Sequence, residues 1–192
     1  SRRRLEGVLN SRDAYVILNS IPDIGPLRVK QLLECFGTPE AVLAASHQSL
    51  TRVHGIGDRL AAAVASWRTQ VDLAAEYDRV ERAGATVITV ADDDYPPLLR
   101  QIYDPPLCLY VRGRVDALHR ANAGIAMVGS RRTDRYGVEA ADHLASAAAV
   151  TGWTVVSGLA RGVDTVVHEA VLRAKGTTVA VIGSGLGKIY PQ

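Results

Sequence analysis

Cysteine, aromatic side chains and long apolar runs are all scarce in this chain. The two cysteines, Cys35 and Cys108, are far apart, and no CxxC or other metal-ligand spacing surrounds them. Neither a disulfide framework nor a metal site is indicated, and a reduced, cytoplasmic protein is the simplest interpretation. No stretch of about 18 apolar residues occurs, so no membrane span is expected. No signal peptide is recognisable, although the chain begins at Ser1 rather than with methionine.

The chain also lacks a large excess of positive or negative charge, and its formal net charge is only +2. Any basic surface must therefore come from local clustering of lysine and arginine. The hydrophobic fraction of 47% is normal for a globular protein and too high for a disordered one. A length of 192 residues allows one large domain or two small ones.

Residues 11–84 have apolar residues at helical spacing, with signals for helix ends between them. Ser11 or Asp13 is expected to cap the first helix, and Thr38 is expected to cap a later one that starts with Pro39. Gly84 closes this part. The pattern predicts an all-helical domain over residues 1–84.

Two turns within this domain have the spacing of helix-hairpin-helix motifs, and Gly57 follows Gly25 by 32 residues. The second has the form apolar-x-Gly-Ile-Gly-x-x-x-Ala from Val53 to Ala61, and the first is looser, with Asp23 where glycine is usual. Such turns grip a duplex phosphate through backbone N–H groups, or they serve only as a compact packing unit. Both interpretations remain open.

The segment from Ala85 to Asn122 is expected to connect the two parts and to add edge strands to the main sheet. Thr86–Val90 and Leu107–Val111 are expected to be its strands. Asp92, Asp93 and Asp94 precede two prolines, and a solvated turn is favoured there over a metal site.

The last third of the chain repeats an apolar strand followed by a small polar loop, with helical sequence after the first two loops. This order is typical of a parallel α/β sheet. The fold class is therefore α/β, a helical domain followed by a parallel sheet domain over residues 85–192. Three strands and two helices cover a sheet poorly, so we expect this domain to be incomplete and the natural protein to continue.

The carboxyl ends of parallel strands meet at one edge, so the three loops are expected to form a single site. We call them the loop rim, residues 129–132, 157–162 and 183–188. Glycine allows close backbone approach and arginine grips phosphate oxygens, so the rim is predicted to bind a phosphate-rich ligand. The candidate residues are Gly129, Ser130, Arg131, Arg132, Ser157, Gly158, Arg161, Gly162, Gly183, Ser184, Gly185 and Lys188.

Several side chains near the rim allow two interpretations. Arg131 either clamps a phosphate or pairs with Asp134, and Tyr136 either stacks on a base or packs against a helix. Asp164 and His168 share a helix face, where a helix cap and a hydrogen-bonded histidine are favoured over a metal pair. The loops fit neither GxGxxG nor GxxxxGK[ST], and no Ser/His/Asp or Cys/His arrangement occurs. No cofactor, metal or catalytic residue is predicted.

The residues from Met127 to Pro191 closely resemble the DNA-processing protein A family (DprA/Smf). The resemblance rests on Met-Val-Gly-Ser-Arg-Arg from Met127, Ser-Gly-Leu-Ala-Arg-Gly-Val-Asp from Ser157 and Val-Ile-Gly-Ser-Gly-Leu from Val181. It extends upstream through Asp94–Leu99 and Pro105–Gly113, and to the helical domain, which is sterile-alpha-motif-like in this family.

The resemblance implies a protein without catalytic activity that binds single-stranded DNA through an extended Rossmann-like domain. It implies protection of incoming strands in natural transformation and recombination, loading of the RecA recombinase, and a homodimer in the full-length protein. The loops at Gly129–Arg131, Ser157–Gly162 and Gly183–Gly185 would form the DNA pocket. Many members carry a basic residue where this chain has Gln192.

Two other functions remain as alternatives. Nucleotide phosphoribohydrolases share a Gly-Ser-basic loop and a Rossmann-like core, but their PGGxGTxxE loop is absent from these residues. A duplex-DNA module would bind through the hairpins instead. Because aromatics make up only 5% of the chain, single-strand contacts are predicted to be mostly to phosphate, with strong salt dependence.

Overall fold

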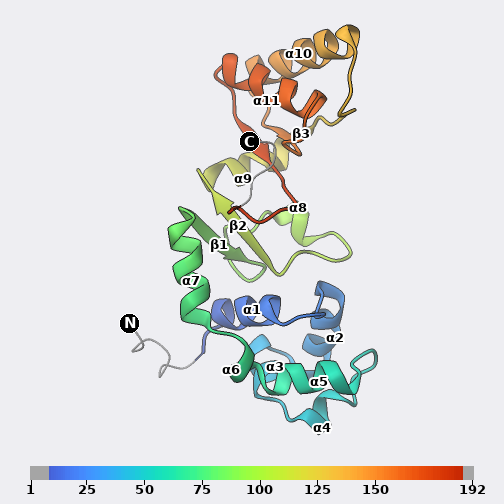
Figure 1. Cartoon of the computed structure of the whole chain (residues 1–192), viewed down its shortest axis with the longest axis vertical. Coiled ribbons are helices and arrows are strands. Elements are labelled where there is room, and N and C mark those ends of the chain that lie inside the picture. The colour runs from blue at the N-terminus through green and yellow to red at the C-terminus, as the bar shows by residue number, and fades with distance from the viewer. Residues whose placement is uncertain (1–8, 188–192) are drawn as a thin grey trace. The chain divides into compact units, whose positions relative to one another are not determined.

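The computed structural model describes residues 9–187, apart from the side chain of Asn122. Its internal contacts divide the chain into two compact units, residues 1–111 and 112–192. The first is mainly helical and the second is a parallel α/β unit (Figure 1). No helix of the described part is long and apolar enough to cross a membrane.

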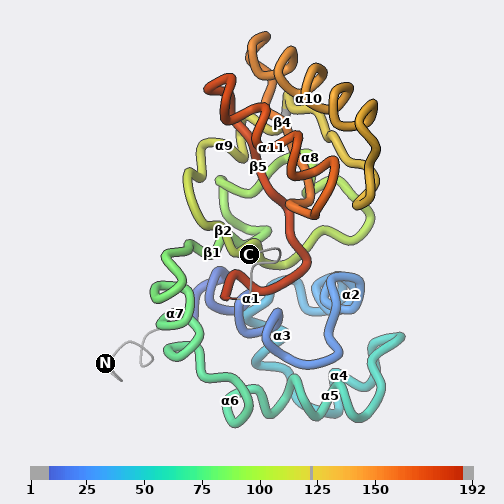
Figure 2. Tube along the Cα trace, turned by 45° about the horizontal axis from the view of Figure 1, so that its top comes forward, coloured from blue at the N-terminus to red at the C-terminus, as the bar shows by residue number. Residues whose placement is uncertain are grey.

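Seven helices build most of the first unit. They are α1 (Ser11–Ser20), α2 (Pro26–Phe36), α3 (Pro39–Ala44), α4 (His47–Leu50), α5 (Asp58–Ala65), α6 (Trp67–Gln70) and α7 (Leu73–Arg82). Asn10, rather than Ser11 or Asp13, caps α1 by accepting the Asp13 N–H. Thr38 caps α3 ahead of Pro39, as its sequence predicts. Helix α1 packs beside α3 and α7, and its apolar face is fully buried (Figures 1 and 2).

The two hairpins pack against each other. Asp23 adopts a left-handed backbone with φ 63°, its carboxylate pairs with Arg59 of the second hairpin, and its carbonyl accepts a hydrogen bond from Arg28. A Cβ at Gly55 would lie 3.1 Å from the side chain of Gln31 on α2. The basic side chains that flank the turns are Arg28, Lys30, Arg52 and Arg59. Asp23 engages two of them, Arg28 and Arg59, which supports the packing-unit interpretation.

The segment after α7 packs with the helices rather than with the main sheet. It contains β1 (Ala85–Thr89), α8 (Pro97–Arg100) and β2 (Cys108–Arg112), and the two strands form a sheet of their own. The prediction that this segment adds edge strands to the main sheet is therefore wrong. Its apolar side chains, including Val87 and Leu107, join the helical core instead. The compact first unit consequently ends at residue 111, whereas the sequence placed the boundary after residue 84.

Asp92 has a structural role in this segment. Its carboxylate accepts hydrogen bonds from Arg12 of α1 at 3.1 Å and from the backbone N–H and hydroxyl of Thr89. Partial burial raises the pKa of Asp92, but the hydrogen bonds from Thr89 and Arg12 outweigh it and lower the pKa. Residues 9–187 contain no cluster of three or more potential metal ligands.

The second unit contains a three-stranded parallel sheet in the order β3-β4-β5. Its elements are α9 (Asp116–Arg120), a 3₁₀ turn (Ala121–Ala123), β3 (Ile125–Ala126), α10 (Arg135–Val150), β4 (Val155–Ser157), α11 (Val163–Arg173) and β5 (Thr178–Ala180). Val155 pairs with Ile125 on one side and with Thr178 on the other. The predicted fold class, a helical part followed by a parallel α/β sheet, is confirmed.

Small residues let the two long helices of this unit approach closely (Figure 2). The buried stripe of α10 is made of alanines at positions 141, 145 and 149, and it packs with Val167, Ala170 and Val171 of α11. A Cβ at Gly176 would lie 2.6 Å from that of Ala149. The amino end of α11 lies beside the carboxyl end of β4, where a Cβ at Gly158 would be 2.8 Å from the Asp164 carboxylate.

Leu32→Ala should lower the free energy of unfolding of the helical unit by about 2–5 kcal/mol, because it empties a fully buried site on α2. Leu27→Ala on the same helix is the matched control, since Leu27 is 39% exposed. In a Trp153→Phe background the remaining tryptophan, Trp67, reports on this unit during urea denaturation. Equal losses for both variants would contradict the packing seen here.

Candidate functional site

The loops after β3 and β4 touch each other at the carboxyl end of the sheet. The N–H of Val163 donates to the carbonyl of Ser130 at 3.1 Å. Gly162 has φ 87°, and a Cβ there would lie 2.3 Å from the Ser130 carbonyl oxygen and 2.8 Å from the Cα of Arg131. Only glycine fits both the backbone conformation and the space. These two loops of the rim therefore form one surface, as the sequence predicts.

The first loop is also pressed against the start of α11. A Cβ at Gly129 would lie 2.8–2.9 Å from three side-chain carbons of Val163. The Ser130 hydroxyl donates to the carbonyl of Arg132 at 2.6 Å and accepts its N–H at 3.1 Å. Ser130 thus shapes the turn itself, and its hydroxyl is already engaged.

The loop presents two arginines to solvent. Arg131 and Arg132 are both exposed, and neither guanidinium has an ion-pair partner within residues 9–187. Asp134 instead caps α10 by accepting the Gly137 N–H at 2.8 Å, so the alternative Arg131–Asp134 pair is not formed. Arg135 pairs with Glu139 one turn along the helix. Two adjacent exposed guanidinium groups are well suited to phosphate oxygens.

The third loop of the rim starts beside the second. The N–H of Val181 donates to the carbonyl of Ser157 at 2.8 Å, which extends the β4–β5 ladder to the point where both loops leave the sheet. Gly183 and Gly185 are exposed, and no atom lies within 4 Å of a Cβ built on either. Ser184 is exposed as well. Lys188 lies outside the described residues.

Beneath the rim, three buried polar side chains line the contact between α11 and the sheet. Ser157 ends β4, Asp164 lies in the first turn of α11, and His168 follows one turn later. Asp164 accepts the Ala160 N–H at 3.3 Å, and a Cβ at Gly158 would lie 2.8 Å from the same carboxylate oxygen. Gly162 rather than Asp164 is the N-cap of α11, so Asp164 holds the second loop rather than capping the helix.

The hydrogen bonds of His168 fix its tautomer. The hydroxyl of Thr178 donates to the Val155 carbonyl at 2.9 Å, so it accepts from Nδ1 of His168 at 2.8 Å. The neutral ring therefore carries its proton on Nδ1. Nε2 is buried without a hydrogen-bond partner in the described part, as are Ser157 Oγ and one oxygen of Asp164. Burial lowers the pKa of His168, against an opposing effect of the Asp164 charge.

The prediction of a hydrogen-bonded His168 is confirmed, but its partner Thr178 was missed. Thr178 lies on the same face of β5 as Ala180, and strand alternation alone does not say which face meets α11. The contact between Val163 and Gly129 was also missed, because it joins the start of α11 to a loop more than 30 residues earlier in the chain.

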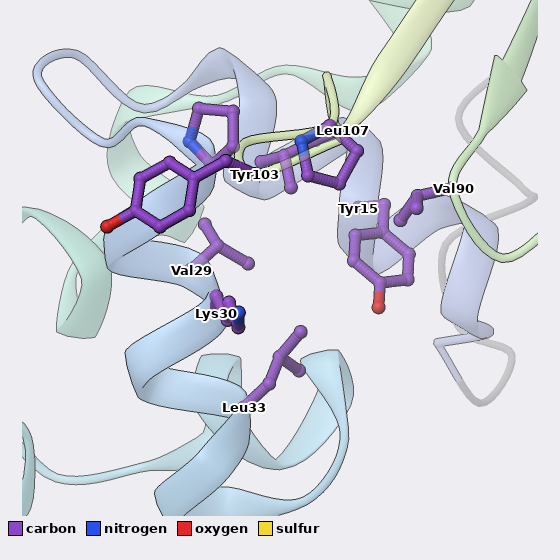
Figure 3. A pocket seen from close by; sticks show the side chains of 9 residues that line it. Tyr15, Val29, Lys30, Leu33, Val90, Tyr103 and Leu107 are labelled. Carbon is purple, nitrogen blue, oxygen red and sulfur yellow. The ribbon is translucent and has the colours of Figure 1, made fainter. Parts of the chain in front are cut away.

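An apolar pocket of about 150 Å³ lies in the other unit (Figure 3). Side chains from α1, α2 and the segment after β1 line it: Tyr15, Pro26, Val29, Lys30, Leu33, Val90, Tyr103, Pro105 and Leu107. It contains none of the predicted site residues. With Lys30 as its one cationic side chain, it lacks the clustered donors that a phosphate site requires.

Gly162→Ala should separate the first two loops of the rim, because the new Cβ strains the backbone and meets main-chain atoms of Ser130 and Arg131. We expect a loss of about 1–3 kcal/mol in stability and faster amide hydrogen exchange in peptides spanning residues 127–137. Gly185→Ala is the matched control, since its Cβ has open space and its φ is ordinary. Unchanged exchange in Gly162→Ala would show that the contact is not required.

His168→Gln should flatten the acid side of the stability profile. The folded-state pKa of His168 is lowered, so its contribution is fully present above the unfolded pKa of about 6.5 and is lost as pH falls below it. Urea denaturation at about pH 7.5 and about pH 5.5 should show a smaller loss for His168→Gln than for the wild type. His143→Gln, an exposed site on α10, should behave as the wild type. Parallel profiles for all three proteins would refute the buried neutral histidine.

Both parts of the chain are similar to known proteins. Residues 86–192, more than half of the chain, match the profile of the family described as DNA recombination-mediator protein A. Residues 16–66 match a SAM-like helix-hairpin-helix tandem. The family match begins close to the predicted boundary after residue 84, whereas the compact unit extends to residue 111.

Individual relatives cover both units. Protein Smf of Synechocystis sp. is 33% identical over 187 residues, which are 95% of this chain and 46% of that protein. DNA processing protein DprA of Bacillus subtilis is 38% identical over 109 residues, 57% of this chain and 36% of that protein. The chain thus spans less than half the length of these relatives. The X-ray structure of DNA processing protein A from Streptococcus pneumoniae matches with a TM-score of 0.76 and 26% identity, over 96% of this chain and 62% of that one. With the profile match over its α/β part, this chain belongs to the DNA recombination-mediator protein A family.

Proposed function

We propose that the chain binds single-stranded DNA through the loop rim, with Arg131 and Arg132 as the principal phosphate contacts. One observation carries this proposal. The first two loops are locked together by backbone contacts and present two exposed guanidinium groups without ion-pair partners among residues 9–187. Because folding already orders these loops, ligand binding does not lose their conformational entropy, and the affinity is higher for that reason.

The chemistry of the rim favours an extended phosphate chain over a single small anion. Exposed arginines follow β3, and Arg161 lies between glycines after β4, so positive charge extends along the carboxyl edge of the sheet. Single-strand binders need such a basic groove along the backbone. We expect weak sequence preference and strong salt dependence, because phosphate contacts carry no sequence information.

The hairpins are a weaker candidate for the DNA site. Arg28 and Arg59 are both engaged by Asp23, and Asp58 pairs with His47 at the start of α5. Carboxylates at both turns oppose a duplex phosphate. Of the basic residues flanking the turns, Lys30 and Arg52 have no ion pair in the described part of the chain.

Family membership supports a role in DNA processing, which the names of the longer relatives describe. We propose that this chain has the same role in recombination and natural transformation. Strand protection, loading of the RecA recombinase and formation of a homodimer are further parts of this proposal. We propose binding without catalysis.

Arg131→Ala should weaken binding of a fluorescein-labelled single-stranded oligonucleotide by about 1–3 kcal/mol, typical of a charge-assisted contact. The slope of log affinity against log salt should also fall by about 0.7, the contribution of one phosphate contact on a single strand. Fluorescence anisotropy across a salt series, with the single strand and its duplex, measures both quantities.

Arg52→Ala is the matched control, because Arg52 is an exposed arginine beside the second hairpin. It should leave single-strand binding unchanged. A preference for duplex that is lost in Arg52→Ala and retained in Arg131→Ala would move the site to the hairpins and overturn the proposal.

A further inference from the structure

The most exposed aromatic ring of the α/β unit's described part stands at the start of α10. The side chain of Tyr136 is 78% exposed, and the buried stripe of α10 is formed by alanines 141, 145 and 149. Of the two interpretations that the sequence allowed, the structure excludes packing against a helix and leaves stacking on a base as a proposal. A tyrosine in open solvent leaves a large apolar surface in water.

The backbone that carries Tyr136 is firmly held. Asp134 caps the helix through the Gly137 N–H, so the first turn of α10 is fixed relative to the preceding loop. Gly137 is packed against Thr133, and a Cβ there would lie 2.1 Å from the threonine hydroxyl. The ring is thus presented on a constrained turn, with few degrees of freedom to lose when it makes a contact.

Tyr136 follows the arginines of the loop rim closely along the chain. Tyr136 follows Arg131 by five residues, so their Cα atoms are at most about 18 Å apart even for a fully extended chain. Val128 after β3 and Val181 after β5 are also exposed at this edge, at 72% and 64%. Exposed apolar side chains and the exposed guanidinium groups of Arg131 and Arg132 therefore both occur after the carboxyl ends of the strands. Among the described residues of this unit, the other exposed aromatic is Trp153, which precedes β4 and belongs to the opposite end of the sheet.

We propose that Tyr136 stacks on an unpaired nucleobase of the strand whose phosphates Arg131 and Arg132 hold. This rests on the proposed function and adds the chemistry that distinguishes single strands from duplex. Bases in a duplex have both faces covered by their neighbours, whereas an unpaired base has a π-face that an aromatic ring can cover. Phosphate contacts alone do not make that distinction.

Fluorescence anisotropy of the full chain with two labelled probes tests this inference. One probe is oligothymidylate, and the other is a strand of equal length in which every base is replaced by an abasic site. Tyr136→Ala should weaken oligothymidylate binding about five-fold or more and leave the abasic strand within about two-fold. Its salt slope should match the wild type, because no phosphate contact is removed. Tyr136→Phe should retain binding, since the ring and not the hydroxyl makes the contact.

Tyr103→Ala is the matched control, because Tyr103 is 77% exposed in the other unit. It should change neither probe. Equal losses on both probes, no loss on oligothymidylate, or the same loss in Tyr103→Ala would each overturn the stacking contact. If Arg131→Ala weakens binding and Tyr136→Ala does not, the inference fails and the proposed function stands. If the wild type binds neither probe, or if binding is insensitive to Arg131, both fail.

Discussion

The contact between the backbone of Gly162 and that of Ser130 and Arg131 is the constraint on which the candidate site depends. A side chain at position 162 would overlap main-chain atoms of the other loop, so the approach is possible only with glycine. The hydrogen bond from Val163 to the Ser130 carbonyl then joins the start of α11 to the first loop. Through this contact a short turn after β3 becomes part of a surface that the β4 loop also forms, and its arginines acquire a defined position.

Buried polar groups support that surface from below. Asp164 uses one carboxylate oxygen to hold the Ala160 N–H, while His168 is held by Thr178. Both side chains are nearly inaccessible to solvent, and burial keeps the imidazole neutral near physiological pH. Asp164 and His168 are thus buried beneath the rim, whereas Arg131 and Arg132 are exposed at its surface. Exposed guanidinium groups on a fixed loop suit a site for a polyanion.

The helical unit shows how a recognisable motif can serve packing. Its tandem hairpins have the spacing of a DNA-binding turn, but Asp23 occupies the position where glycine is usual and engages Arg28 and Arg59. The segment containing β1 and β2 packs in the same unit. Its apolar side chains join the helical core, and β1 contacts α1 and α7. The sequence predicts that both segments are strands. It does not show which sheet they join, because that depends on the apolar surface against which they pack.

The amino-acid sequence alone predicts the parallel α/β class, the tandem of hairpins and the glycine and arginine residues of the loop rim. These follow from local periodicity, caps and turn residues, which act over a few positions. The folded structure was needed to show that Gly162 touches Ser130, that Thr178 holds His168, that Arg131 does not pair with Asp134 and that Tyr136 is exposed. Each of these depends on packing and exposure that local sequence does not encode, because strand register and helix packing set them across distant parts of the chain.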